Sequence, residues 1–344
     1  MYLMDALSSS VALMHWVNPS SAPEVDLNRH VLDIYPAVVE KLKGTPRFLL
    51  DTNTIHTAVE LTLGRPKVLL EAMRHLRVPY ERMWIEWPEE GRAKLRETFG
   101  DQGRIDEHRP LPARIGFLIE ADKETGRTGR ITWIWNGPPL LRPADFPNIA
   151  PISPVFDLDA RIDQPSERIA GFLRGNLARI WKDNPVQLKA LFDIWRTAKH
   201  EPSEWGWTYI NHYQRTTGRL EQHLGDLFAD VYGEYIIIWA IILLLTSSRK
   251  IVDYKPVSRA KINKARVKRR EVPLLDHTEV TLDIGIRRVP GQTGQPLGYI
   301  RKSPRIHMVS SYLARRGDKH WVVMPYWRGS GETIHRQVKV FAPA

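Results

Sequence analysis

The sequence predicts an α+β protein, because helical patterns fill its first and middle parts and strands with turns dominate its end. Residues 26–100 and 166–248 carry apolar residues mostly at helical spacing, interrupted by turn signals. Between them, Ala113 to Gly137 is typical of a β-hairpin, since two β-rich runs flank the turn-forming residues DKETGRTG. The final part, beyond Arg270, changes to short strands separated by glycine and proline.

In chain order, we expect short helices at 26–44, 55–64 and 66–78, a strand at 82–87 and a helix at 89–100. The second arm of the hairpin should place Trp133 and Trp135 on one face, because side chains alternate along a strand. Further helices are expected at 166–183 and 185–200, followed by a long helix that starts near Leu220.

The length of 344 residues exceeds what one hydrophobic core usually serves, so we expect two domains, or one domain with a large elaboration. A proline-rich stretch gives the clearest boundary. We therefore predict a helical part with the hairpin at 1–137, a connector at 138–165, a helical core at 166–254 and a basic, β-rich binding part at 255–344.

The most apolar segment is YIIIWAIILLLTSS, from Tyr235 to Ser248. It is short for a membrane span, which needs about 20 residues, so we expect a buried helix. A helical hairpin at a membrane and a buried strand are the alternatives. The sequence begins without the basic, apolar pattern of a signal peptide. It has no cysteine, which excludes disulfides, thiolate zinc sites and cysteine nucleophiles and fits a reducing interior. We therefore expect a cytoplasmic protein with no membrane partner.

The positive charge is confined to the end of the chain. From Arg249 onward there are 21 Lys and Arg against 7 Asp and Glu, whereas the first 248 residues carry 29 against 32. A field of one sign in one region attracts polyanions or an acidic protein surface. The sequence therefore predicts a binding function in the C-terminal part.

The basic segment from Arg249 to Arg270 has two interpretations. A solvated helix or linker is the usual role of a charge run. Alternatively, its side chains contact phosphates of RNA or the ribosome, because neutralising phosphates releases counterions and strengthens binding. The candidate contact residues are Lys255, Arg259, Lys261, Asn263, Lys264 and Arg266.

A second basic set is interleaved with aromatic residues in and around DKHWVVMPYWRGSG, from Asp318 to Gly331. Single-stranded RNA sites use this mixture, and so do protein interfaces; packing of a small β-region is the third alternative. We expect Trp321 to anchor the strand from behind, while a turn or bulge at Pro325 exposes Trp327. The candidate contact residues are Arg315, Arg316, His320, Tyr326, Trp327, Arg328 and Gly329.

Catalytic and cofactor motifs are weak. His307, His320 and His335 match no compact zinc spacing, and the chain has no Walker loop, dinucleotide fingerprint or nucleophile elbow. We therefore predict no catalytic residue, metal or cofactor, and favour a binding protein over an enzyme.

One fragment supports the alternative interpretation that the protein is a metal-dependent ribonuclease. RFLLDTNTI, from Arg47 to Ile55, looks like the first strand of PIN-type ribonucleases, in which the aspartate is a metal ligand. Such hydrolysis needs several converging carboxylates, for which Glu86, Glu97, Asp157 and Asp159 are available. The favoured alternative is that Asp51 or Thr52 caps the helix that follows.

The order of parts carries a resemblance. The hairpin, YIIIWAIILLL, VSRAKINKAR from Val257 to Arg266 and YWRGSG from Tyr326 to Gly331 follow one another along the chain. In this order, and in its V-S-R, N-K and Y-W-x-G-x-G elements, the chain resembles the phage- and plasmid-borne anti-CRISPR family that blocks biogenesis of the type V-A CRISPR effector nuclease.

The resemblance implies a mobile-element protein in the bacterial cytoplasm that recognises the N-terminal peptide of the nascent effector, within a ribosome–nascent chain complex, and leads to loss of the effector's mRNA. Related prophage proteins share the tail motif, so a nucleic-acid-binding regulatory protein of a prophage is a further alternative.

Overall fold

The computed structural model describes residues 2–13, 24–88, 114–136, 147–161, 184–203, 206–218, 220–247 and 251–282, and four short strands between 307 and 328. The helices expected at 89–100 and 166–183 lie outside the described residues.

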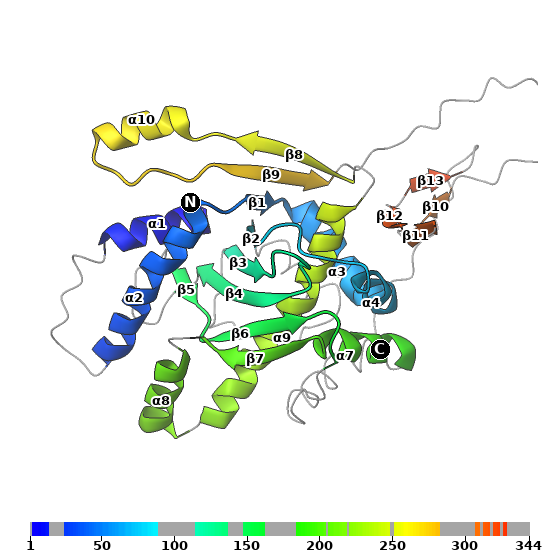
Figure 1. Ribbon diagram of the computed structural model, residues 1–344, viewed down its shortest axis with the longest axis horizontal. Helices are drawn as coiled ribbons and strands as arrows, with labels where there is room; N and C mark the ends of the chain where they lie inside the picture. The colour runs from blue at the N-terminus through cyan, green and yellow to red at the C-terminus, as the bar shows by residue number, and fades with distance from the viewer. Residues whose placement is uncertain are drawn as a thin grey trace, which may run out of the picture.

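A mixed sheet of nine described strands forms the centre of the molecule (Figure 1). Its order is β7-β6-β4-β3-β2-β1-β9-β8, with β5 also paired to β4. β1 is parallel to both β2 and β9, and the other pairs are antiparallel. The bounds are β1 Arg47–Leu50, β2 Arg82–Pro88, β3 Arg114–Ala121, β4 Thr128–Asn136, β5 Pro147–Ile149, β6 Ile152–Asp157, β7 Ala198–Pro202, β8 Val252–Val257 and β9 His277–Leu282.

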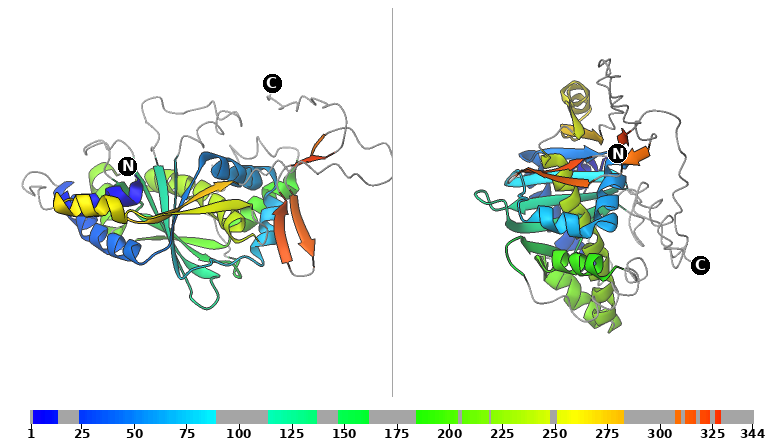
Figure 2. Two further views of the ribbon diagram at one scale, coloured as in Figure 1. Left: turned by 90° about the horizontal axis from the view of Figure 1, so that it is seen from above. Right: turned by 90° about the vertical axis from the view of Figure 1, so that its right-hand side faces the viewer.

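Helices cover both faces of this sheet (Figure 2). α1 and α2 pack on one face, and α3, α4, α7 and α9 pack on the other. This mixture of helices with a largely antiparallel sheet confirms the predicted α+β class. The helices are α1 Leu3–Leu13, α2 Glu24–Lys43, α3 Thr52–Gly64, α4 Pro66–Met73, α7 Pro185–Trp195, α8 Gly206–Thr217, α9 Leu220–Thr246 and α10 Ala260–Lys268.

The central strands are buried on both faces. In β1, Leu49 joins the core beneath α1 and α2, while its neighbours Phe48 and Leu50 join the core beneath α3 and α9. In β2, Trp84 packs on the first side and Ile85 on the second. Strands covered on both faces have near-continuous apolar sequences rather than alternating ones, and RFLL and RMWIEW follow that rule.

The predicted hairpin is confirmed. β3 and β4 pair from Arg114 opposite Asn136 to Ala121 opposite Gly129. In the turn, the carboxylate of Asp122 accepts the Thr125 N–H at 2.7 Å, and Gly126 has a φ of 61°, which favours glycine. Trp133 and Trp135 lie on one face as expected, with ring centroids 5.0 Å apart.

The apolar segment is a buried helix, as predicted. Residues 235–244 form the second half of α9 and are buried against the sheet. Trp239 makes edge-on contacts with Phe156, at 5.0 Å between ring centroids, and with Tyr235 at 5.6 Å. None of the helices in the described ranges combines the length and apolarity that a membrane crossing requires.

Two helix predictions were too long. The helix expected at 66–78 ends at Met73, and the one expected at 185–200 ends at Trp195, after which Ala198 begins strand β7. Apolar residues at the ends of these segments are buried without being helical. Val78 lies in an irregular segment, and Ala198 lies in a strand. The four predicted parts all contribute strands to the one sheet, and their behaviour as separate folding units stays a prediction.

Candidate nucleic-acid interface

The basic segment forms an arm made of β8, α10 and β9. The two strands pair antiparallel, from Val252 opposite Leu282 to Val257 opposite His277, and α10 connects them at one end (Figure 1). β8 is the last strand in the order of the sheet, and α10 has no buried residue. The basic region therefore contains a helix, which was one of the two forms left open by the sequence, and the sides of this helix face solvent rather than a core.

Local hydrogen bonds hold α10 against the chain that returns to β9. The side chain of Asn263 donates to the Leu274 carbonyl at 2.9 Å and accepts the Leu274 N–H at 2.8 Å. Arg266 donates to the Val272 carbonyl at 2.8 Å and forms an ion pair with Glu271 at 3.0 Å. These two predicted contact residues thus have a structural role on the inner side of the arm.

The base of the arm is tied to α1. The Leu275 N–H donates to the Asp5 carboxylate at 3.1 Å, and burial raises the pKa of that carboxyl. The Arg259 guanidinium lies over the Tyr2 ring, with its central carbon 5.5 Å from the ring centroid. His277 meets the same ring edge-on at 4.9 Å, and burial lowers its pKa. Arg259 is therefore anchored as well.

Three lysines remain on the outer side. Lys261, Lys264 and Lys268 are exposed at the i, i+3, i+7 spacing that places side chains on one side of a helix. In the part of the chain that the structure describes, no carboxylate lies in ion-pair distance of any of them. Lys255 differs, because it pairs across the strands with Glu279 at 3.1 Å. The lysine face of α10, defined as these three residues, is thus a cationic surface without acidic partners in the described ranges.

The aromatic C-terminal stretch divides between two small sheets. β11 Tyr312–Arg316 pairs with β12 Lys319–Val323, which places Arg315 opposite His320 and Arg316 opposite Lys319. β10 His307–Val309 pairs with β13 Tyr326–Arg328. The chain therefore leaves one pair at Val323 and enters another at Tyr326, on either side of the predicted break at Pro325.

The two basic sets are far apart. Both Figure 1 and Figure 2 place α10 at one end of the molecule and the β10–β13 strands at the other. The described part of the structure includes neither Gly329 nor the side chains of six other predicted contact residues, which are Arg315, Arg316, His320, Tyr326, Trp327 and Arg328. Their predicted contacts, and the anchoring role of Trp321, stay predictions.

The carboxylates required by the ribonuclease alternative have other partners. Asp51 accepts the Thr54 N–H at 2.9 Å and so caps α3, as the favoured interpretation expects. Glu86 is buried and accepts the N–H groups that begin α1, at Leu3 and Met4. Across the described ranges no three metal-ligating side chains come together; Glu97 lies outside those ranges.

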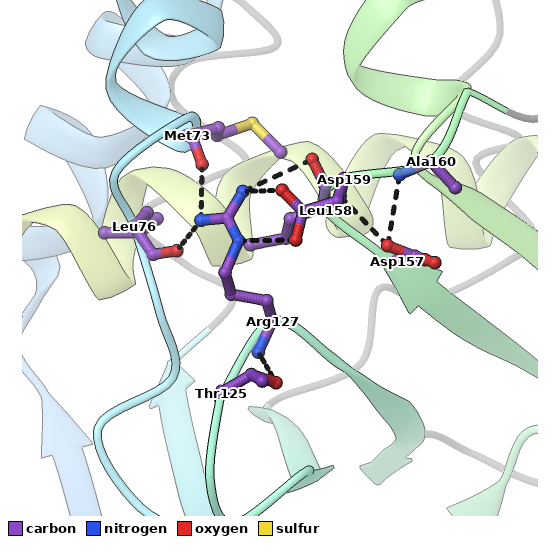
Figure 3. Close-up of polar contacts among 8 residues, drawn as sticks. All are labelled: Met73, Leu76, Thr125, Arg127, Asp157, Leu158, Asp159 and Ala160. Carbon is purple, nitrogen blue, oxygen red and sulfur yellow. Dashed lines mark hydrogen bonds and ion pairs between the residues drawn. The ribbon is translucent and has the colours of Figure 1, made fainter.

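Asp157 and Asp159 belong to a structural cluster around Arg127 (Figure 3). The Arg127 guanidinium donates to both carboxylate oxygens of Asp159, at 2.8 and 2.7 Å, and holds the pKa of that carboxyl below its usual value. It also donates to the Leu76 carbonyl at 2.7 Å, just beyond α4. Asp157 accepts the N–H groups of Asp159 and Ala160 at 2.9 and 3.1 Å. The cluster joins the hairpin turn to α4 and the end of β6.

Replacing Asp51 with alanine should lower the free energy of unfolding by about 1 kcal/mol, because the N-terminus of α3 loses its cap. Asparagine at the same position keeps an acceptor oxygen and should cost less. Denaturant unfolding measures both. The ribonuclease alternative would gain support if Asp51→Asn removed a magnesium-dependent RNA cleavage without changing stability.

A cavity of about 670 Å³ lies beside the base of the arm and was not foreseen from sequence. Its lining includes the rings of Phe48, Tyr80 and Tyr254, which come from β1, the approach to β2, and β8. The available sequence signal was the pair Tyr254-Lys255, an aromatic residue beside a cation at the start of the basic segment.

Comparisons of the chain with protein-family models, with curated proteins and with solved structures find no match.

Proposed function

We propose that the protein binds RNA through the lysine face of α10. The observation that carries this proposal is the absence of acidic partners for Lys261, Lys264 and Lys268 among the described residues. Three like charges on one side of a short helix repel one another, and α10 buries no apolar residue in return. A polyanion that neutralises them would relieve this repulsion and release counterions.

RNA is preferred to a protein partner for the arm. Protein interfaces have apolar and aromatic centres from which lysine is depleted, whereas the lysine face consists of charges. Ile262 and Val267 are the large exposed apolar residues of α10, at 46% and 59% exposure. Two aliphatic side chains give a small apolar area, so electrostatic attachment to phosphates accounts better for the surface.

The finer proposal concerns which RNA is bound. The segment VSRAKINKAR, which carries part of the resemblance to the anti-CRISPR family, spans the end of β8 and most of α10. We propose that the arm attaches to the ribosome or message while a type V effector is being made, and that the C-terminal aromatic strands recognise the effector's N-terminal peptide. Support comes from the motifs and from the position of the basic set on an exposed arm.

Reversing Lys261, Lys264 and Lys268 to glutamate should weaken binding to a single-stranded RNA and lower the slope of log K against log salt by about 2, since each phosphate contact on a single strand contributes about 0.7. Fluorescence anisotropy at four salt concentrations measures this slope. Arg266 is left unchanged because its contacts hold the arm together.

A matched control reverses Lys67, Lys123 and Lys199, which are exposed on other elements and give the same net charge. This control should keep a slope close to that of the unmodified protein. Equal losses in the two triple variants would assign RNA binding to overall charge and contradict a site on α10.

The finer proposal has its own readout. Expression beside a type V effector should lower the amount of effector mRNA, and the lysine-face variant should restore it. An effector mRNA whose altered codons encode a different N-terminal peptide should persist beside either the unmodified protein or the lysine-face variant. If the unmodified protein lowered the altered and unaltered mRNAs equally, recognition of the nascent peptide would be excluded.

A further inference from the structure

The cavity beside the arm lies close to the lysine face along the chain, where a second part of the same RNA ligand could bind. Its wall includes Tyr254, Pro256 and Val257 of β8 and continues through Ser258. Arg259 follows directly at the N-cap position of α10, so Lys261 lies in the first turn of the helix, three residues beyond the cavity wall. A ligand that reaches from the lysine face toward the body of the protein would pass the cavity.

The aromatic residues of the cavity form a floor and two exposed walls. Phe48 is buried, with 7% exposure, whereas Tyr80 and Tyr254 are exposed at 44% and 45%. The Phe48 ring centroid is 5.9 Å from that of Tyr80 and 6.3 Å from that of Tyr254. Large aromatic residues with this exposure beside a cavity provide flat surfaces to a planar ligand.

The position of Tyr254 is fixed. Its hydroxyl donates to the Leu245 carbonyl in the last turn of α9 at 2.6 Å. Burial and the neighbouring Tyr80 raise its pKa, so the ring stays neutral at ordinary pH. A neutral ring held by its hydroxyl, with part of its surface open, is suited to stacking.

The polar lining indicates which planar ligand fits. Hydroxyl groups of Ser258 and Thr278 can donate or accept. Arg47 also lines the cavity and is held in place, since its guanidinium donates to the carbonyls of Asp276 and Leu42. Asp276 also lines the cavity and carries the opposite charge to Arg47, so the charged residues do not select the ligand. Hydroxyls and rings together suit a nucleobase, which has a π-face and hydrogen-bonding edges.

We propose that the cavity takes an unpaired nucleobase of the RNA that the lysine face binds, with Tyr80 and Tyr254 as stacking surfaces. This inference rests on the proposed RNA binding and adds to it a preference for single-stranded over double-stranded RNA. Bases in a duplex are stacked on one another and cannot enter, whereas single-strand sites combine cations along the backbone with rings for the bases.

The test compares binding of a single-stranded RNA and of a duplex of the same length by the full chain and by Tyr80→Leu, Tyr254→Leu and Tyr254→Phe. The two leucine variants should each lose about tenfold in single-strand affinity, as removal of one stacking ring does, and keep their duplex affinity. Tyr254→Phe retains the ring and should stay within about threefold. The fluorescence of a 2-aminopurine base placed in the single strand should be quenched when the full chain binds, and quenched less when the leucine variants bind.

The outcomes separate this inference from the proposed function. Leucine variants that bind the single strand as the full chain does, or a full chain that prefers the duplex, would overturn the nucleobase subsite while RNA binding by α10 stands. If a peptide covered the Tyr254 ring and RNA binding stayed unchanged, the cavity would not hold a nucleobase, and the inference would also be overturned. If the full chain binds neither RNA, the proposed function and the subsite fall together. Thermal unfolding tests whether each variant is folded. Tyr80 is 44% exposed and its hydroxyl forms no hydrogen bond with another described residue, so Tyr80→Leu should change stability least.

Discussion

Replacing Glu86 with leucine should lower the free energy of unfolding by about 3 to 5 kcal/mol, the cost of removing one partner from a buried charged network. Glu86 is fully buried in β2. Its carboxylate accepts the Leu3 N–H at 2.7 Å, the Met4 N–H at 3.3 Å and the Trp84 indole N–H at 3.1 Å, and it pairs with Arg114. Leucine would leave all of these donors without their acceptor.

Denaturant unfolding should be followed together with hydrogen exchange in α1. Glu86 supplies the acceptor for the first N–H groups of that helix, so its loss should expose α1 more than α9. Glu86→Gln keeps one oxygen and should cost less, about 2 kcal/mol. Glu60→Gln, on the exposed side of α3, is the matched control and should change stability by less than about 0.5 kcal/mol.

The double variant Glu86→Leu with Arg114→Met should recover part of the loss, because neither charge is then left alone. An unchanged unfolding midpoint in Glu86→Leu would show that the carboxylate does not anchor α1. It would also return Glu86 to the set of carboxylates available for metal binding.

Local features of the fold were predictable from sequence. The turn between β3 and β4 depends on Asp122 and Gly126, and the start of α3 depends on Asp51, so each signal lies within a few residues of its effect. The burial of residues 235–244 follows from their uninterrupted apolarity. In each case the interaction is short-range in the chain, which is the range that propensity and periodicity describe.

Long-range pairing was not predictable in the same way. β1 lies between β2 and β9, with Phe48 opposite both Ile85 and Thr278. Nothing in RFLL specifies these neighbours, because strand pairing depends on the burial of whole faces. This pairing attaches the basic arm to the main sheet and brings Phe48, Tyr80 and Tyr254 together.

The candidate site shows the same division. The basic composition of the arm was evident, but the separation of Lys261 and Lys264 from Asn263 and Arg266 follows from hydrogen bonds to the returning chain. One long-range signal was present in RMWIEW, where Glu86 stands between Ile85 and Trp87. A charge in an apolar strand requires buried partners, although the sequence does not say that α1 provides them.

Replacing Trp239 with alanine should cost about 3 to 5 kcal/mol, as large-to-small changes of buried aromatic residues do. Trp239 has no exposed surface and lies where α9 meets the sheet, against Phe156 and Tyr235. The cavity left by the indole cannot close, because the second half of α9 is held by other buried residues between 235 and 244. A loss of this size is a large fraction of the stability of an ordinary domain, which is about 5 to 15 kcal/mol.

Trp239→Phe separates packing from hydrogen bonding. The indole N–H is buried and has no acceptor among the described residues, so phenylalanine removes an unsatisfied donor while keeping an aromatic ring in contact with Phe156. We expect it to cost less than about half of the alanine effect. Trp207→Ala is the control, because Trp207 is 59% exposed on α8 and its removal opens no internal cavity. Equal destabilisation by Trp239→Ala and Trp207→Ala in chemical denaturation would contradict the packing of α9 against the sheet and the central role of the apolar segment in the core.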